Sequence, residues 1–343
     1  MRFLATPLLG LTGSLLLLAA VGCNNEPLLD TGNRLEPDDF EDKDLVPDAI
    51  VDTHFQVGVP AVDVLWVVDN SRSMYEEQRA LTNNFTSFMK FFSDSELDLD
   101  YHIGVVSTGY DSETERGQLM VGHDHRGDTI HWIDPEVRNS DEAFREMALL
   151  GTEGPMDEKG RAQVYTALQT LGDTTNQGFL RPDAYLSVIV LSDEDDFSGD
   201  IPVSEDQFID WLRGLKDTPE QVSFSSIVAP EGDACPGLAP STEYLGVTAA
   251  VGGVIHPICE PSWASIMEDL GMSAAGLRSE FALSQLPNEK TIEIFVREPR
   301  QPEKEVAIGL GVRYVRARNA VVFTDDPPGP NARVRISYEA LDY

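Results

Sequence analysis

The sequence has little positive charge. It contains 25 lysine and arginine residues against 59 aspartate and glutamate residues, which gives a formal net charge of −34 over 343 residues. Phosphate backbones and anionic lipid headgroups repel a chain of this sign. The composition therefore argues against nucleic acid and an anionic membrane surface as direct ligands.

Cysteine is also scarce, and the common catalytic motifs are missing. The three cysteines are Cys23, Cys235 and Cys259. The chain has no Gly-x-Ser-x-Gly elbow, no His-Glu-x-x-His motif and no P-loop. His123 and His125 lie near His131 in the sequence, so a zinc site is an alternative, but surface histidines in a polar loop are the commoner outcome without a third placed ligand. We do not expect an enzyme.

The first 22 residues have the pattern of a targeting segment. Arg2 gives the positive start, and the apolar stretch over residues 8–21 is too short for a stable membrane span. The stretch ends in Leu-Ala-Ala-Val-Gly-Cys, which resembles a bacterial lipobox. That resemblance implies cleavage before Cys23 and lipidation of its thiol, and Asn24 favours the outer membrane of a Gram-negative bacterium. A plain secreted protein with an incidental cysteine is the alternative.

The next segment and the two remaining cysteines fit an exported protein. Residues 23–52 hold ten acidic residues against Arg34 and Lys43, so we predict an acidic, disordered tether. Cys235 and Cys259 then remain as an even pair, which most simply forms one disulfide outside the cytosol. A metal pair is the alternative, but no nearby side chains complete a structural zinc site.

From residue 59 the chain alternates strand and helix patterns. The predicted strands cover residues 62–68, 101–107, 185–191, 222–229 and 254–258, and the predicted helices cover 74–92, 141–150, 161–171, 204–215, 242–251 and 262–277. This alternation is typical of an α/β fold, here a doubly wound, mainly parallel sheet with helices on both faces. We assign it to a domain over residues 53–283.

The pattern changes after residue 283. Short strand-like runs separated by Pro, Gly, Asn and Asp predict a small antiparallel β module over residues 284–343. The charge changes as well: residues 53–279 hold 39 acidic and 13 basic residues, whereas residues 280–343 hold 10 and 9. Both shifts indicate a second module.

A motif with oxygen donors follows the first strand of the α/β pattern. The apolar run Val62–Val68 ends in Asp-Asn-Ser-Arg-Ser, whose oxygen-bearing side chains include Asp69, Ser71 and Ser73. Ligands bind at the carboxyl ends of strands in open α/β sheets. Hard oxygen donors without sulfur or imidazole suit Mg²⁺, Ca²⁺ or Mn²⁺. A turn and helix cap without a metal is the alternative.

The segment Val64–Met74, VLWVVDNSRSM, resembles the metal-ion-dependent adhesion site of von Willebrand factor A (VWA) domains. The resemblance implies a VWA fold over the α/β segment. It also implies that Ser71 and Ser73 contact a divalent ion directly, while Asp69 holds the ion mostly through water.

The same resemblance implies donors from two further loops. Thr152 is the second-loop candidate because it lies between two predicted helices, and Thr174 and Thr175 are its rivals. Asp193 occupies the third-loop aspartate position, just after a predicted strand. A solvated acidic loop is the alternative interpretation of the run Ser192–Asp196.

These features together predict a lipid-anchored envelope protein that binds a protein or other macromolecule through a divalent cation. The open position of the ion would take a carboxylate of the partner, and the membrane would be contacted through the lipid alone. One alternative is a structural envelope protein whose metal stabilises the fold. Another is a metal-dependent enzyme or assembly subunit, although Ser71 and Ser73 have no evident histidine base.

Overall fold

The computed structural model describes residues 49–56, 58–93, 99–309, 311–316, 318–324, 327–329 and 331–341. The predicted signal peptide, Cys23 and the tether up to residue 48 lie outside the described residues. Within the described ranges, no helix is long and apolar enough to cross a membrane.

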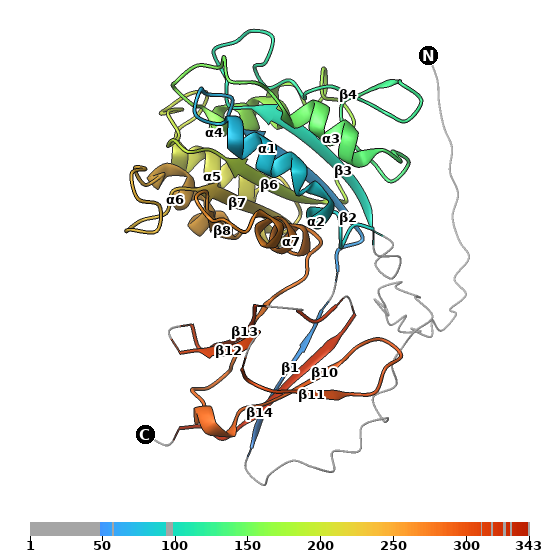
Figure 1. Cartoon of the computed structure of the whole chain (residues 1–343), viewed down its shortest axis with the longest axis vertical. Coiled ribbons are helices and arrows are strands. Elements are labelled where there is room, and N and C mark those ends of the chain that lie inside the picture. Colours follow the sequence, from blue (N-terminus) through green and yellow to red (C-terminus); the bar gives the residue numbers. More distant parts are fainter. Residues whose placement is uncertain are drawn as a thin grey trace, which may run out of the picture. The chain divides into compact units, whose positions relative to one another are not determined.

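A five-stranded parallel sheet forms the centre of the α/β part (Figure 1). Its strands, in spatial order, are β3 (Asp100–Ser107), β2 (Ala61–Val68), β6 (Tyr185–Leu191), β7 (Val222–Val228) and β8 (Ile255–Pro257). Every neighbouring pair is parallel, which confirms the predicted sheet. The interior strand β2 is buried along nearly its whole length, as its continuous apolar run predicts.

Helices cover both faces of this sheet. One face carries α1 (Tyr75–Asn83), α2 (Phe85–Phe88), α3 (Ser140–Ala148) and α7 (Trp263–Ala274), and the other carries α4 (Gly160–Tyr165), the π-helical turn Thr166–Thr170, α5 (Glu205–Arg213) and α6 (Thr242–Val251). Successive residues of β2 alternate between the two cores. Trp66 packs edge-on against Phe88 and Phe144 on one face, while Leu65 belongs to the cluster of Phe208 on the other.

The single helix predicted over residues 74–92 is divided at Asn84. The backbone N–H of Asn84 points to the carbonyl groups of Ala80 and Leu81, and its side-chain amide donates to the Ala80 carbonyl at 2.8 Å. Asparagine competes in this way for the carbonyl groups of the preceding turn. The apolar periodicity continues across the break, which is why it predicts one helix.

Two small elements complete this part of the chain. A short hairpin, β4 (Gly122–His123) and β5 (Thr129–Ile130), lies between β3 and α3, and a 3₁₀ turn (Pro219–Gln221) precedes β7. Helix α5 begins with a capping box in which Ser204 and Gln207 each bond the other's backbone N–H.

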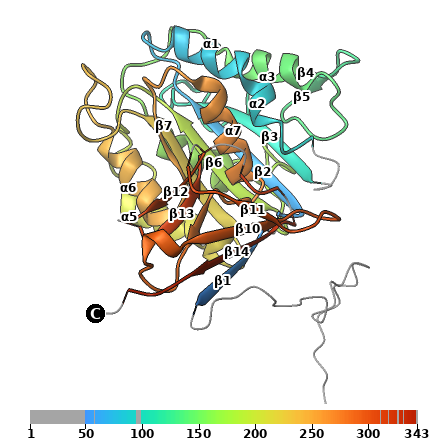
Figure 2. The same ribbon diagram turned by 60° about the horizontal axis from the view of Figure 1, so that its bottom comes forward.

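The remaining strands form two antiparallel sheets with a shared core (Figure 2). The first sheet has the order β1 (Ile50–Phe55), β14 (Arg333–Tyr338), β10 (Glu293–Arg297) and β11 (Lys304–Val306), and the second has the order β12 (Val312–Val315), β13 (Ala320–Phe323) and β9 (Glu280–Ala282). A 3₁₀ turn, Glu289–Thr291, precedes β10. The antiparallel character agrees with the prediction for the C-terminal segment.

Strand pairing brings residues from outside the predicted β module into these sheets. Strand β1 pairs with β14 over its whole length, although the sequence pattern assigns residues 50–52 to the tether and 53–55 to the α/β domain. Strand β9, also predicted in the α/β domain, pairs with β13. The α/β part is therefore inserted between the first strand of the β module and the rest of it.

Gln56 links the two chain segments that connect the α/β part to the β module, one after β1 and the other after α7. Its side chain is 1% exposed. The side-chain amide donates to the Arg278 carbonyl at 2.6 Å and accepts from the Arg278 N–H at 3.0 Å. The outgoing chain after α7 is thus held against the incoming chain after β1.

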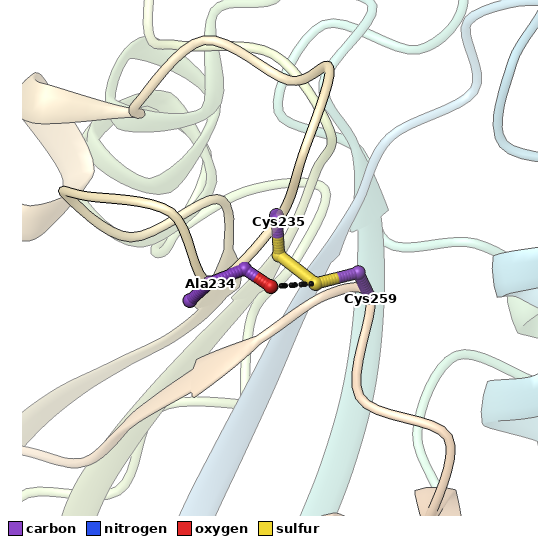
Figure 3. Close-up of a disulfide and its surroundings, with 3 residues drawn as sticks. All are labelled: Ala234, Cys235 and Cys259. Atoms are coloured by element: carbon purple, nitrogen blue, oxygen red, sulfur yellow. Dashed lines mark hydrogen bonds between the residues drawn. A yellow bond between two sulfur atoms is a disulfide. The ribbon is translucent and has the colours of Figure 1, made fainter.

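The predicted disulfide between Cys235 and Cys259 is present (Figure 3). It links the loop after β7 to the residues after β8, and the Cys259 sulfur lies 3.1 Å from the Ala234 carbonyl oxygen. The sulfur of a disulfide has no hydrogen, so this is a contact and not a hydrogen bond.

Removing this disulfide should destabilise the protein. Its two cysteines are 24 residues apart, and closing a loop of that size restricts the unfolded chain by about 3 kcal/mol in the loop-entropy model. We expect Cys235→Ser with Cys259→Ser to lower the free energy of unfolding by about that amount in urea titrations. Wild-type protein under reducing conditions is the matched control and should behave like the double variant. Equal stability of oxidised wild type and variant would contradict the prediction.

Candidate metal centre

Two neighbouring strands bring the first and third predicted loops together. Val68 and Leu191, the last residues of β2 and β6, are paired in register. Asp69 donates its backbone N–H to the Leu191 carbonyl at 3.0 Å, and the Ser192 hydroxyl donates to Asp69 Oδ2 at 2.6 Å. The Asp69 carboxylate is therefore fixed between the ends of the two strands.

Four of the five predicted ligand residues form a continuous set of polar contacts. The Ser71 N–H donates to Asp69 Oδ1 at 2.7 Å, and the Ser71 and Ser73 hydroxyl oxygens are 3.3 Å apart. The Ser73 hydroxyl donates in turn to Asp193 Oδ1 at 3.1 Å. Asp69 and Ser71 are buried, whereas Ser73 is exposed. The set thus reaches from the protein interior to solvent.

The loop that carries Thr152 lies beside this set. Buried Gln78 donates from Nε2 to the Asp69 carbonyl at 2.8 Å and to the Gly151 carbonyl at 2.9 Å. The Gly154 N–H donates to the Asn70 carbonyl at 2.9 Å. Thr152 is therefore held on a loop bonded at both sides to the Asp69 segment, and its role as a ligand stays a prediction.

The rival threonines lie in the turn after the π-helical segment. Both Thr174 and Thr175 are exposed, and the Thr174 hydroxyl donates to the Leu171 carbonyl at 3.3 Å. These contacts give neither residue a link to the Asp69 segment.

Glu158 is a candidate that the sequence analysis missed. This side chain is fully buried and follows the Thr152 loop, directly before α4. One carboxylate oxygen accepts a hydrogen bond from the Thr108 hydroxyl. The other, Oε1, has no hydrogen-bond partner among the described residues. Buried carboxylate oxygens without a partner are rare and call for an explanation.

The charges in this region repel one another. Burial, and next the charge of Asp69, raises the pKa of Glu158 to about 8. Burial likewise raises the pKa of Asp69, and the charge of Asp193 adds to this effect, while hydrogen bonds from Ser192 and Ser71 oppose it. The pKa of Glu194 is raised by burial and then by Asp69 and Asp193. A cation among these groups would favour their ionised forms.

The donor set fits a hard divalent ion only if hydroxyl and water oxygens take part. Within the described part of the chain, no group of three or more His, Cys, Asp or Glu side chains is arranged to hold an ion. Carboxylate, hydroxyl and water oxygens are ligands that Mg²⁺, Ca²⁺ and Mn²⁺ accept. An ion here would combine the serine oxygens with one or two carboxylates and water.

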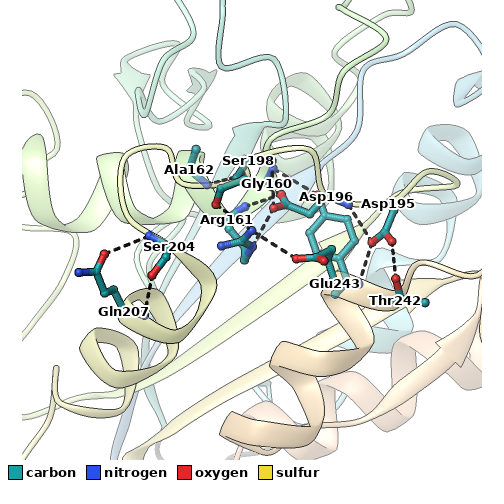
Figure 4. A network of polar contacts seen from close by, with 12 residues as sticks. Gly160, Arg161, Ala162, Asp195, Asp196, Ser198, Ser204, Gln207, Thr242 and Glu243 are labelled. Carbon is teal, nitrogen blue, oxygen red and sulfur yellow. Dashed lines mark hydrogen bonds and ion pairs between the residues drawn. The ribbon is translucent and has the colours of Figure 1, made fainter.

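The last two acids of the run after β6, Asp195 and Asp196, bond to residues of α4 and α6 (Figure 4). Asp196 accepts from the Arg161 N–H at 3.0 Å and forms an ion pair with the Arg161 guanidinium at 2.8 Å. Asp195 accepts from the Thr242 hydroxyl at 2.9 Å and from the Glu243 N–H at 3.0 Å. These two acids fasten the loop to α4 and α6, whereas Asp193 belongs to the Asp69 set and Glu194 is close enough for Asp69 and Asp193 to raise its pKa.

The histidines of the β4–β5 hairpin have other partners. His123 Nδ1 lies 2.9 Å from a Glu146 carboxylate oxygen, and both side chains are about half exposed. His125 and His131 are exposed. The arrangement agrees with surface histidines in a polar hairpin.

Comparisons with known proteins add little to this picture. No protein-family model matches the chain, and no curated protein matches it in a sequence search. Among solved structures it is similar to proximal thread matrix protein 1 (PTMP1) from the mussel byssus, in two crystal structures. The first match has 13% identity and a TM-score of 0.39, and covers 68% of this chain and 52% of that chain. The second has 13% identity and a TM-score of 0.38, and covers 66% and 48%. The chain thus spans about half of PTMP1, and similarity this low carries no argument about function.

Proposed function

We propose that the α/β part is a VWA-type domain that binds a divalent cation, Mg²⁺ or else Ca²⁺ or Mn²⁺, and through it a carboxylate of a macromolecular partner. The observation that carries the proposal is the meeting of Asp69, Ser71, Ser73 and Asp193 at one sheet edge, beside a buried Glu158 oxygen without a partner among the described residues. A bound cation would screen the repulsion between Asp69 and Asp193, and it would give the buried Glu158 oxygen a partner.

Each residue has a distinct task in this proposal. Ser71 and Ser73 offer neutral oxygens directly to the ion, and Thr152 does so from the second loop. Asp69 and Asp193 hold it mainly through water, and Ser192 orients the Asp69 carboxylate by its 2.6 Å hydrogen bond. A divalent ion held largely by neutral donors keeps its attraction for a further oxygen anion, which the partner would supply.

The proposed setting is the cell envelope. Lipidation at Cys23 would anchor the chain in the membrane, most simply the outer membrane of a Gram-negative bacterium, and several acyl chains give stable anchoring.

Cys23→Ser should release the protein from the membrane. Without the thiol there is no acceptor for the lipid, so we expect the variant to move entirely to the soluble fraction after cell disruption. Fractionation and detergent phase partitioning measure this, and Thr31→Ser serves as the control that keeps Cys23 and the disulfide. Membrane attachment of the Cys23→Ser variant equal to that of wild type would refute lipidation at this site.

Partner capture tests the proposed function. Immobilised wild-type protein in Mg²⁺ should retain a component of envelope extracts that chelator releases, and Asp69→Ala protein should not retain it. The released component should lose binding when its exposed carboxylates are converted to amides. If Mg²⁺ raises the unfolding temperature but chelator releases nothing, the metal has a structural role and the adhesion function is wrong.

A further inference from the structure

A recess with two arginines lies next to the candidate metal centre. It occupies 290 Å³ and is lined by residues of α1 and the end of α3, among them Tyr75, Gln78, Arg79, Arg145, Leu149 and Gly151. These two helices contact each other on one face of the sheet (Figure 1). A pocket of this size can hold one amino-acid side chain.

The recess and the metal centre share a wall. Gln78, which lines the recess, donates to the carbonyl groups of both Asp69 and Gly151. Tyr75, which also lines the recess, follows Ser73 by two residues. A partner segment that reached an ion at Ser71 and Ser73 would therefore lie close to the recess.

The recess offers positive charge in an acidic domain. Residues 53–279 have 39 acidic and only 13 basic residues. In the described part of the chain, neither Arg79 nor Arg145 forms an ion pair with a carboxylate, whereas Arg161 and Arg181 do. The Arg79 guanidinium lies 5.4 Å from the centre of the Tyr75 ring and donates to its hydroxyl at 3.4 Å. These guanidinium groups are available to an external anion.

Tyr75 and Leu149 give the recess an apolar surface that is open to solvent. The side chain of Tyr75 is 56% exposed and that of Leu149 is 41% exposed. An exposed apolar surface beside charged groups is typical of a recognition site. A glutamate side chain matches it, because its methylene groups can pack against Tyr75 and Leu149 while its carboxylate reaches the arginines.

We propose that this recess is a second recognition site for an acidic protein segment, in which one carboxylate binds the ion and a neighbouring glutamate binds Arg79 and Arg145. This inference rests on the proposed ion-dependent function. It narrows the partner to a protein segment with two acidic side chains a few residues apart.

Paired peptides test the second site separately from the first. The probes are fluorescently labelled, capped peptides with an aspartate and a glutamate separated by one to four Gly or Ser residues, together with versions in which glutamine replaces the glutamate. In saturating Mg²⁺ and at one spacing or more, wild-type protein should bind the glutamate peptide about tenfold more tightly, as loss of one charge-assisted contact predicts. Fluorescence anisotropy measures both affinities.

The arginine variants decide where the preference arises. Arg79→Gln with Arg145→Gln should bind both peptides equally, with the affinity that wild type shows for the glutamine peptide. Arg126→Gln with Arg138→Gln removes the same charge from exposed positions and should keep the preference. Ion-dependent binding without a glutamate preference, or a preference that persists without Arg79 and Arg145, would overturn the second site and leave the metal site standing.

Two other outcomes would decide against the ion-dependent function or against a protein partner. If chelator does not weaken binding of either peptide, the proposed function fails and the second site fails with it. If a polyuronate displaces both peptides and glutamate gives no advantage, the surface recognises acidic polysaccharide and the inference of a protein partner is wrong.

Discussion

Asp69→Ala should abolish divalent-ion binding while the protein stays folded. The Asp69 carboxylate is fixed between β2 and β6, by Ser192 and by the Ser71 N–H. Loss of a residue that positions an ion costs 10- to 100-fold even from outside the ligand shell, so we expect affinity to fall by at least about 100-fold. The two apolar cores on either face of the sheet do not depend on the ion.

Calorimetry with Mg²⁺, Ca²⁺ and Mn²⁺ measures this effect. Ser71→Ala and Thr152→Ala should weaken binding less, because a neutral oxygen contributes less to an ion than a carboxylate does. Asp128→Ala, which removes an exposed acid from the β4–β5 hairpin, is the matched control and should bind as wild type does. Wild-type affinity in Asp69→Ala would rule out the metal centre, whereas normal binding by Thr152→Ala alone would move the second-loop role to another residue, with Glu158 next to test.

Glu158→Gln should change how the stability of the ion-free protein depends on pH. The folded-state pKa of Glu158 is about 8, against 4.5 for an ordinary glutamate. Below pH 4.5 the group is protonated in both the folded and the unfolded chain, so its full contribution to stability is present. Between pH 4.5 and about 8 only the folded chain keeps the proton, so the free energy of unfolding should fall by about 1.4 kcal/mol per pH unit from this group.

Urea unfolding in chelator at several pH values between 4.5 and 9 tests this expectation. The substituted glutamine side chain would keep an acceptor for Thr108 and carry no charge, so the variant should gain stability over wild type as the pH rises. Glu153→Gln, an exposed change on the same loop, is the control and should follow wild type. Saturating Mg²⁺ should stabilise wild type most at high pH, and a constant difference between wild type and variant across the range would refute the raised pKa.

Much of the α/β part can be predicted from local patterns. Strands β2, β6 and β7 are short apolar runs, and β2 is followed by a helical pattern at once. Because parallel strands end at a common edge, that order places the Asp69 loop and the loop that carries Asp193 at the same edge of the sheet. The pairing of β2 with β6, which brings Ser73 to Asp193 and Ser192 to Asp69, is seen only in the structure.

The features that escaped prediction depend on contacts between distant residues. Strand β1 has the acidic Asp52 within it and directly follows the acid-rich segment. Its pairing with β14 cannot be read locally, nor can the hydrogen bond from the Tyr338 hydroxyl to Asp52 at 2.7 Å. Glu158 was missed for a related reason: the sequence shows one more acid in a polar loop, and only the folded chain reveals its complete burial.

The insertion of the α/β part after β1 has a mechanical consequence. If Cys23 is anchored and a partner is held at Asp69, tension runs along the chain through β1 and then β2, which are in series. Strand β2 is bonded to neighbours on both sides, whereas β1 is an edge strand that pairs, within the described residues, with β14 alone. Under load, β1 would therefore detach first and lengthen the linkage, while the sheet that carries the proposed ion site stays intact.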